Sequence, residues 1–402
     1  MITGSTDHLE AGPTAPDAVV AGHVSLDVFP ALYGPVKLEP GRLVVVGPAV
    51  ISTGGAVANT GVALHRLGVR VGLIAKVGGD LFGRAVLDAL QKHGEQLADG
   101  IVVSAEEATS YTIVISPPGV DRSFLHCPGA NQTFSAHDIP YGGLTGVRVF
   151  HFGYPPLMPQ MYADGGAQLR TMFARVQAAG AATALDLCEP DPESEAGRVD
   201  WPRVLGRALP FVDVFAPSID ELLFAFHRTA YEQLQAGAPL ASIVDHKRLA
   251  ELGALLTGMG AAVVAIKLGD QGLYLRTTHE TPRMLAFCRR MGLDAEAWRA
   301  RELISPCFQA RTVSGTTGSG DATIAGLLAA LLRGAGPAEA TTSATAVGAC
   351  SVEAVDPTSG IPAWTHIAQR IADGWARLPV DIALGPDVAV ERDATGTMVL
   401  LA

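Results

Sequence analysis

Residues 315–321 carry the groups most able to do chemistry in this chain. They read Gly-Thr-Thr-Gly-Ser-Gly-Asp, so glycines stand at 315, 318 and 320, before Asp321. The apolar residues that follow have the i, i+3, i+4, i+7 spacing of a buried helical face: Ile324, Leu327, Leu328 and Leu331. Asp321 is therefore expected near the start of a buried helix.

A helix start preceded by glycines can bind an anion. The first N–H groups of a helix have no partner within it, and the helix dipole places its positive end there. Glycine lets the backbone approach a phosphate because it has no Cβ. Transfer of a phosphoryl group to a hydroxyl uses both features, since amides bind the phosphate and a carboxylate such as Asp321 accepts the hydroxyl proton.

Two other interpretations of this segment lead to different functions. Asp321 could be a helix N-cap and the glycines ordinary turn residues, and the sequence leaves this interpretation open. Gly318-x-Gly320 could also begin a Gly-x-Gly-x-x-Gly dinucleotide fingerprint, but the third glycine is replaced by Thr323. Glu339, the acidic residue farther on, lies in Gly-Pro-Ala-Glu-Ala rather than at the end of a strand. Dinucleotide binding is therefore set aside.

Composition excludes several classes of function. The chain has 402 residues, enough for a large buried core, and a formal net charge of −11 without a basic run, so nucleic acid is not an expected partner. Its five cysteines are scattered and form no Cys-x-x-Cys, which is typical of reduced thiols. No apolar run is long enough to span a membrane, and the polar N-terminal residues show no signal-peptide pattern. A cytoplasmic protein with no membrane partner is therefore expected.

Strands and helices are predicted to alternate along most of the chain. This pattern indicates parallel βαβ units, and hence a mostly parallel sheet with helices on both faces. We expect one domain over residues 18–402, after a loose, polar tail at residues 1–17. Strands are expected at 18–22, 69–75, 147–152, 182–187, 211–216 and 261–266.

Two regions depart from this alternation. Short strand-like pieces within residues 101–134 have no helix between them, and with residues 30–50 they are predicted to form a small antiparallel sheet standing apart from the main one. Residues 277–310 are predicted to be an irregular insertion. An uncovered apolar face on the small sheet would favour a homodimer through this sheet.

Two motifs in this order resemble those of the ribokinase-like (PfkB) carbohydrate kinases. The first is Gly54-Gly55-x-x-x-Asn59, continuing to Gly79-Asp80-x-x-Gly83, and the second is Thr316-Thr-Gly-Ser-Gly-Asp321. The resemblance covers roughly residues 18–375. It implies a ribokinase-like α/β fold with a small antiparallel β lid, and phosphorylation of a hydroxymethyl group on a sugar or sugar derivative by ATP with Mg²⁺.

The resemblance also implies roles for particular residues. Asp321 would be the catalytic base, and the amides of Gly318, Ser319 and Gly320 would form the anion hole. The sugar hydroxyls would meet Asp27, Gly54, Gly55 and Asn59. Taken without the motif, Asn59 could instead be a helix cap and Asp27 a turn residue.

On the nucleotide side, the resemblance implies a turn formed by Lys267, Gly269 and Gly272, although a plain hairpin would also explain Lys267. Glu221 would act near the phosphates and, indirectly, the metal. The family often has Asn-x-x-Glu there, and this chain has Ser218 in place of the asparagine. Gly315 stands where relatives commonly have an aspartate that helps bind a monovalent cation, so potassium activation is not expected.

Two other functions remain open at this level. A nucleoside kinase would need an apolar or aromatic slot for a base in its acceptor site. A catalytically silent sugar-binding regulator would have the same fold without turnover, and sugar-dependent release of ADP would distinguish it from a kinase.

Overall fold

The computed structural model describes residues 15–34, 36, 39–117, 123–386 and 388–401. Most of the tail predicted at residues 1–17 therefore lies outside the described residues. Asp17, which is described, forms an ion pair with Arg70 at 2.8 Å, just before the first strand.

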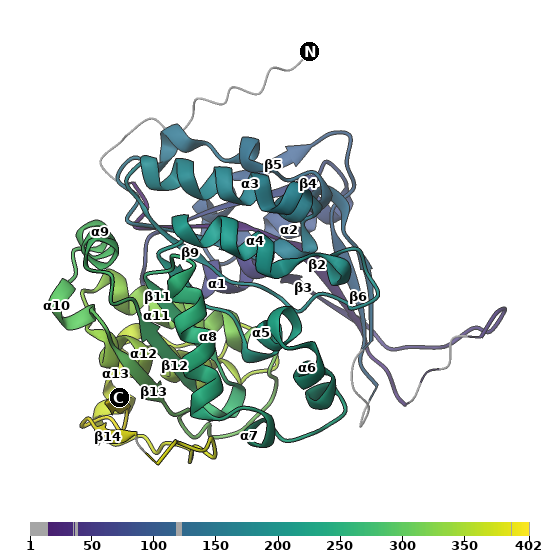
Figure 1. The fold of residues 1–402 in the computed structure, drawn as a ribbon. Helices are drawn as coiled ribbons and strands as arrows, with labels where there is room; N and C mark the ends of the chain where they lie inside the picture. Colours follow the sequence, from purple (N-terminus) through teal and green to yellow (C-terminus); the bar gives the residue numbers. More distant parts are fainter. Residues whose placement is uncertain (1–14, 35, 37–38, 118–122, 387, 402) are drawn as a thin grey trace.

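One large sheet forms the centre of the molecule (Figure 1). Its 11 strands are, from edge to edge, β5 (Ile101–Ser104), β4 (Val71–Gly78), β1 (Ala18–Gly22), β8 (Val149–Gly153), β9 (Ala182–Leu185), β10 (Val214–Phe215), β11 (Val263–Lys267), β12 (Leu273–Thr277), β13 (Glu302–Ser305), β15 (Met398–Leu401) and β14 (Ala389–Arg392). Neighbouring strands from β5 to β11 are parallel, and those from β11 to β14 are antiparallel. The prediction of a mostly parallel sheet is confirmed.

Helices cover both faces, because alternate residues of each buried strand point to opposite sides. In β1, Val20 packs in one hydrophobic core, while Val19 and Ala21 pack in the other. The first core contains residues of α1 (Ala56–Arg66), α2 (Leu81–Gln91), α9 (Thr281–Met291), α10 (Ala295–Trp298), α11 (Ser319–Leu332), α12 (Pro337–Ser351) and α13 (Trp364–Ala372). The second contains residues of α3 (Pro159–Ala178), α4 (Trp201–Ala208), α5 (Ile219–Phe226), α6 (Arg228–Gln235), α7 (Leu240–Ile243) and α8 (His246–Gly258). Among the described residues, no helix has both the length and the apolar character that a membrane span requires.

A second, four-stranded sheet stands beside the main one and forms the lid. Its order is β3 (Ala49–Gly54), β2 (Ser25–Pro30), β6 (Tyr111–Ile115) and β7 (Ser123–Cys127). The outer pairs are antiparallel and the central pair, β2 with β6, is parallel. The predicted small sheet is therefore present, but its central pair is parallel, and β2 and β3 lie at the two ends of the predicted 30–50 range rather than within it.

The placement of residues 101–104 in the lid was wrong. These residues form β5, which pairs in parallel with β4 at the edge of the main sheet. The helix α2 between β4 and β5 provides the crossover that a parallel pair needs, so this piece completes a βαβ unit.

The prediction of an irregular segment at residues 277–310 was also wrong. It contains α9, α10 and β13, and β13 pairs with β12 in the main sheet. Its basic residues also have a structural function, since Arg290 and Arg283 form ion pairs with the buried Asp213. These two arginines therefore compensate a buried carboxylate.

Candidate active site

The helix predicted at the end of segment 315–321 is α11, which begins at Ser319. Its N-cap is Gly318 rather than Asp321. Gly318 has a left-handed backbone, with φ of 74°, and the helix start has no side-chain cap. Asp321 is the third residue of the helix and only 2% exposed. The N-cap interpretation is therefore wrong, and the buried carboxylate needs another explanation.

Side chains from two distant segments bind the Asp321 carboxylate. Asn59 Nδ2 donates to Oδ2 at 2.9 Å, and Thr60 Oγ1 donates to Oδ1 at 3.2 Å. Tyr154 OH donates to Oδ2 at 2.7 Å. Burial raises the pKa of Asp321, while these hydrogen bonds and the charge of Lys267 oppose the rise. The result is an oriented carboxylate that is more basic than an exposed one.

Tyr154 and Thr60 were not assigned this contact from the sequence. Tyr154 directly follows β8 and has a left-handed backbone, with φ of 66°. In open α/β sheets, ligands bind at the carboxyl ends of the strands, so the position after β8 was a usable signal. Thr60 follows Asn59 in the first turns of α1, and nothing in the local sequence indicates that its hydroxyl meets Asp321.

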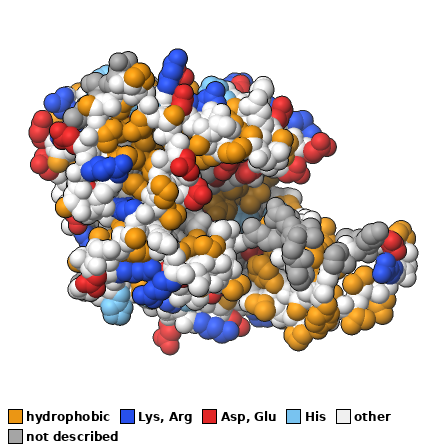
Figure 2. Space-filling view, turned by 90° about the horizontal axis from the view of Figure 1, so that it is seen from below, with side chains coloured by type: hydrophobic (Ala, Val, Ile, Leu, Met, Phe, Trp, Pro, Cys, Tyr) orange, Lys and Arg blue, Asp and Glu red, His pale blue; other side chains and the backbone are white. Residues whose placement is uncertain are grey.

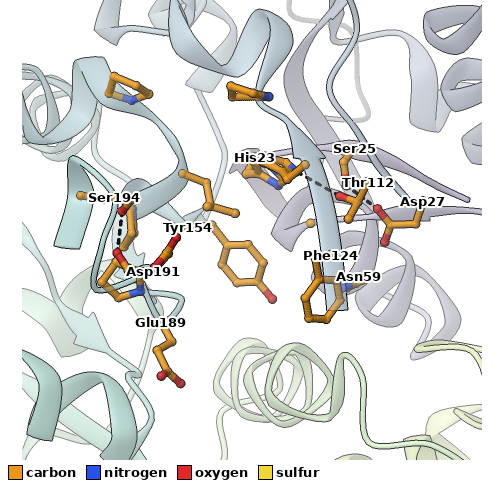
Figure 3. A pocket seen from close by; sticks show the side chains of 18 of the residues that line it. His23, Ser25, Asp27, Asn59, Thr112, Phe124, Tyr154, Glu189, Asp191 and Ser194 are labelled. Carbon is orange, nitrogen blue, oxygen red and sulfur yellow. Dashed lines mark hydrogen bonds between the residues drawn. The ribbon is translucent and has the colours of Figure 1, made fainter. Parts of the chain in front are cut away.

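A cavity of about 780 Å³ lies between the lid and the main sheet. Its wall includes three of the residues predicted to contact sugar hydroxyls, Asp27, Gly55 and Asn59. Figure 3 shows Asp27, Thr112 and Asn59 on one side, Glu189, Asp191 and Ser194 on the other, and Tyr154 between them. Ser25 Oγ donates to Asp27 Oδ1 at 2.8 Å, and burial raises the pKa of Asp27. We call this space the acceptor cavity.

The strand register explains why polar lid residues reach the acceptor cavity. Paired positions across the lid form a polar row of Ser52, Asp27, Thr112 and His126. The next row along the same strands is apolar and consists of Ile51, Val28, Ile113 and Leu125. Adjacent rows face opposite sides of a sheet, so the polar row faces the cavity and the apolar row faces away.

Gly54 and Gly55 provide close approach rather than side-chain contacts. A Cβ on Gly54 would lie 2.1 Å from Asp27 Oδ2, so only glycine leaves room for this carboxylate. Gly55 has φ of 89°, and a Cβ there would lie 2.5 Å from His23 Nδ1. The His23 ring lines the acceptor cavity, and burial lowers its pKa to about 3, so it is neutral at physiological pH.

A second cavity, of about 480 Å³, lies on the other side of the α11 N-terminus. The predicted nucleotide-side residues Lys267, Gly269 and Gly272 line it, together with Ser319 and Gly320. Much of the remaining wall is apolar: Phe308, Ala310, Val313, Ala349, Val352 and Leu378. A largely apolar cavity beside a helix N-terminus suits a nucleotide base and its phosphates.

A third cavity, of about 280 Å³, lies at the α11 N-terminus and contains Lys267, Gly318, Gly320 and Asp321 in its wall. It shares Tyr154 and Gly318 with the acceptor cavity, and Lys267 and Gly320 with the second cavity. The Ser319 amide, predicted as part of the anion hole, already donates to the Thr316 carbonyl at 3.2 Å. The Gly318 and Gly320 amides are therefore the stronger candidates for binding a phosphate. We call this space the phosphate cavity.

Ser218 and Glu221 both line the phosphate cavity, where they form the capping box of α5. Glu221 N donates to Ser218 Oγ at 3.2 Å, and Ser218 N donates to Glu221 Oε2 at 2.7 Å. Ser218 therefore acts as a cap, and its short side chain stays near the helix start. Burial raises the pKa of Glu221, and the Lys267 charge opposes this.

No cluster of three or more metal-binding side chains occurs among the described residues. Magnesium in phosphate-transferring sites is typically held by one or two carboxylates together with the substrate phosphates and waters. Glu221 and its neighbour Asp220 both line the phosphate cavity, which fits this type of site.

Comparison with known proteins agrees with the fold. The model of the pfkB family carbohydrate kinases matches residues 15–364, and the chain belongs to this family. Fructokinase-2 of Oryza sativa subsp. japonica is 27% identical over 146 residues, which are 36% of this chain and 41% of the relative. Fructokinase of Vibrio alginolyticus is 26% identical over 288 residues, 70% of this chain and 76% of the relative. The matches to the fructokinases of Oryza sativa and of two Solanum species each span about two fifths of the relative's own length.

Solved structures share the fold at low sequence identity. Ribokinase of Arabidopsis thaliana, complexed with ribose and ATP, is 17% identical, has a TM-score of 0.66, and is matched over 89% of this chain and 98% of its own. Fructokinase of Xylella fastidiosa, with bound ATP, is 21% identical, has a TM-score of 0.65, and is matched over 89% and 99% of the two chains. The ribokinase-like architecture is therefore confirmed.

Proposed function

We propose that this protein transfers the γ-phosphoryl group of ATP to a hydroxymethyl group of a sugar or sugar derivative. The observation that carries the proposal is the position of Asp321. Its buried carboxylate lines a phosphate cavity that adjoins an acceptor cavity on one side and a nucleotide-sized cavity on the other. The ATP bound in the two related kinase structures supports the choice of nucleotide.

In the proposed reaction, Asp321 accepts the proton of the acceptor hydroxyl while the oxygen of that hydroxyl forms a bond to the γ-phosphorus of ATP. The bond from phosphorus to the ADP oxygen breaks, and ADP leaves. The Gly318 and Gly320 amides and the Lys267 ammonium group stabilise the charge on the transferring phosphoryl group. Magnesium, near Glu221 and Asp220, would neutralise part of the phosphate charge.

Asp27 and Asn59 would bind acceptor hydroxyls. Both side chains line the acceptor cavity, and Asn59 also donates to Asp321, so it can orient the base and the substrate together. A lid above the site would exclude water and so prevent hydrolysis of ATP.

The volume and wall of the acceptor cavity favour a nucleoside, or another sugar with a substituent, as a second candidate acceptor. At about 780 Å³ the cavity lies in the upper part of the range for small-molecule pockets. Phe124, Tyr154 and Tyr162 line it along with several prolines, which could provide an apolar slot for a base.

Acceptor-dependent release of ADP tests the proposal. The purified protein is incubated with ATP, Mg²⁺ and a panel of sugars, sugar acids and nucleosides. Turnover with a sugar supports the main proposal, and turnover restricted to nucleosides supports the second candidate. Tight ATP binding without turnover on any acceptor would instead support the catalytically silent sugar-binding regulator.

A further inference from the structure

Asp186, which directly follows β9, is a buried carboxylate that no role so far explains. It is 0% exposed, and neither carboxylate oxygen has a hydrogen-bond partner within the described part of the chain. Two groups lie near it, the Nε2 of His151 at 3.5 Å from Oδ1 and the Nζ of Lys267 at 4.0 Å from Oδ2. Burying an unpartnered charge is costly, so this arrangement needs a functional reason.

Asp213 shows how the same strands treat a structural aspartate. It lies just before β10, at the opposite end of the strands, and is also 0% exposed. It accepts a hydrogen bond from Thr183 N at 2.9 Å and pairs with Arg283 and Arg290. Asp213 is fully partnered, whereas Asp186 lies at the carboxyl ends of the strands with one loosely placed cation.

Lys267 lies between Asp186 and the start of α11. It ends β11, and its Nζ would be 3.4 Å from a Cβ built on Gly320. The ammonium group is therefore close both to Asp186 and to Gly320, whose amide is proposed to bind the phosphate. His151 does not compete for the carboxylate as a cation, because burial lowers its pKa to about 3.

The two charges depend on each other. Burial raises the pKa of Asp186, Asp321 and Glu221 add to the rise, and Lys267 is the side-chain charge that opposes it. Without Lys267 this opposition would be lost, and the pKa of Asp186 would rise further. The Lys267 ammonium group, 4.0 Å from Asp186 Oδ2, therefore favours the charged form of the carboxyl group beside it.

We propose that Asp186 is a positioning residue that holds the Lys267 ammonium group over the α11 N-terminus, where the transferring phosphate binds. The proposal rests on the proposed kinase function. A phosphate entering the cavity meets an ammonium group that is already aimed at it and does not have to be ordered during the reaction. Such preorganisation is a main source of catalysis in charge-stabilising sites.

A double-mutant cycle with Asp186→Asn and Lys267→Met tests this role. Lys267→Met should lower kcat by roughly 10²–10³-fold, the usual loss for one charge-stabilising donor. Asp186→Asn should lower kcat by about tenfold, because the lysine stays but is no longer held. In the Lys267→Met background, Asp186→Asn should change nothing further, since no ammonium group remains there for Asp186 to hold. An equal loss in both backgrounds, or no loss in either, would overturn the proposal.

ATP affinity, measured by calorimetry, provides a readout that does not need the acceptor. Asp186→Asn should tighten ATP binding by about tenfold when Lys267 is present, because the ammonium charge is then uncompensated, and should have no effect when residue 267 is Met. Equal weakening in both backgrounds would contradict the coupling. Absence of turnover in the wild-type protein would count against the kinase function alone, since the calorimetric cycle still tests the pair.

Asp213→Asn is the matched control, because it removes the charge of a buried aspartate at the other end of the strands. It should lower the melting temperature and leave kcat and ATP affinity unchanged. If it reproduces the effect of Asp186→Asn, the latter reflects general damage and the positioning role is wrong. Asp186→Ser, a smaller neutral variant, provides the same comparison if the amide does not fold.

Discussion

Replacing Asp321 by Asn tests the centre of the proposed mechanism. The amide has nearly the shape of the carboxylate, so its oxygen can still accept from Asn59 and Tyr154, which now donate to Oδ2 at 2.9 and 2.7 Å. The amide NH₂ would face Thr60 Oγ1, which can rotate its hydroxyl and accept. The substitution therefore preserves the packing and removes only the proton acceptor.

The expected effect on turnover is large. A positioned general base contributes roughly 10²–10⁴-fold, and at about 1.4 kcal/mol per factor of ten the barrier should rise by about 2.8–5.6 kcal/mol. ATP binding should survive or tighten slightly, because a negative charge beside the phosphate cavity is gone. The melting temperature should barely move, since Asp321 is not the helix cap.

Initial rates of ADP release, ATP calorimetry and a thermal melt measure these three quantities on the same protein. Asp80→Asn is the control, because Asp80 is a true N-cap whose side chain accepts from Gly83 N, and Asn caps helices about as well. It should have nearly normal turnover. If Asp321→Asn also turns over its acceptor at a near-normal rate, Asp321 is not the base and the proposed mechanism is wrong.

Three further predictions concern the surroundings of the site. Tyr154→Phe removes a hydrogen bond that lowers the pKa of Asp321, so the acid limb of the pH profile of kcat/KM should move to higher pH, and a shift to lower pH would contradict this. Exchanging K⁺ for Na⁺ should change turnover little, because Gly315 provides no carboxylate for a bound cation, and a strong, selective activation by K⁺ would show that backbone carbonyls suffice. We expect a homodimer through the apolar row of the lid, where Ile51 and Leu125 are 60% and 50% exposed, and light scattering should show Ile51→Lys shifting it toward the monomer. A wild-type monomer at high concentration would contradict that expectation.

Figure 2 shows why the lid is the expected interface. Hydrophobic side chains gather on the part of the molecule that projects from the main body. Leu43 and Val45, in the segment between β2 and β3, are 88% and 78% exposed, and the apolar row of the lid lies on the face turned away from the cavity. A second copy of the lid would cover this face without closing the site.

Local patterns in the sequence were enough to predict the class of fold and the centre of the site. Strand and helix alternation depends on which residues within a few positions are apolar, so the parallel sheet could be predicted without any long-range information. The glycines before Asp321 and the apolar stripe after it likewise define a helix start that can bind an anion. The two motifs then indicated the family.

The tertiary structure decided what each site residue contacts. Asp321 meets Asn59 and Tyr154, which are 262 and 167 residues away along the chain, and no local pattern encodes such distances. Residues 101–104 have the same apolar, β-branched character as the lid strands, and only the competition between pairing partners places them beside β4. The pairing of Asp186 with Lys267 likewise arises because the carboxyl ends of β9 and β11 lie at the same edge of the sheet, on either side of β10. Burial and charge at these positions are properties of the assembled core, so the direction in which the pKa values of Asp321 and Asp186 are shifted could be inferred only from the fold.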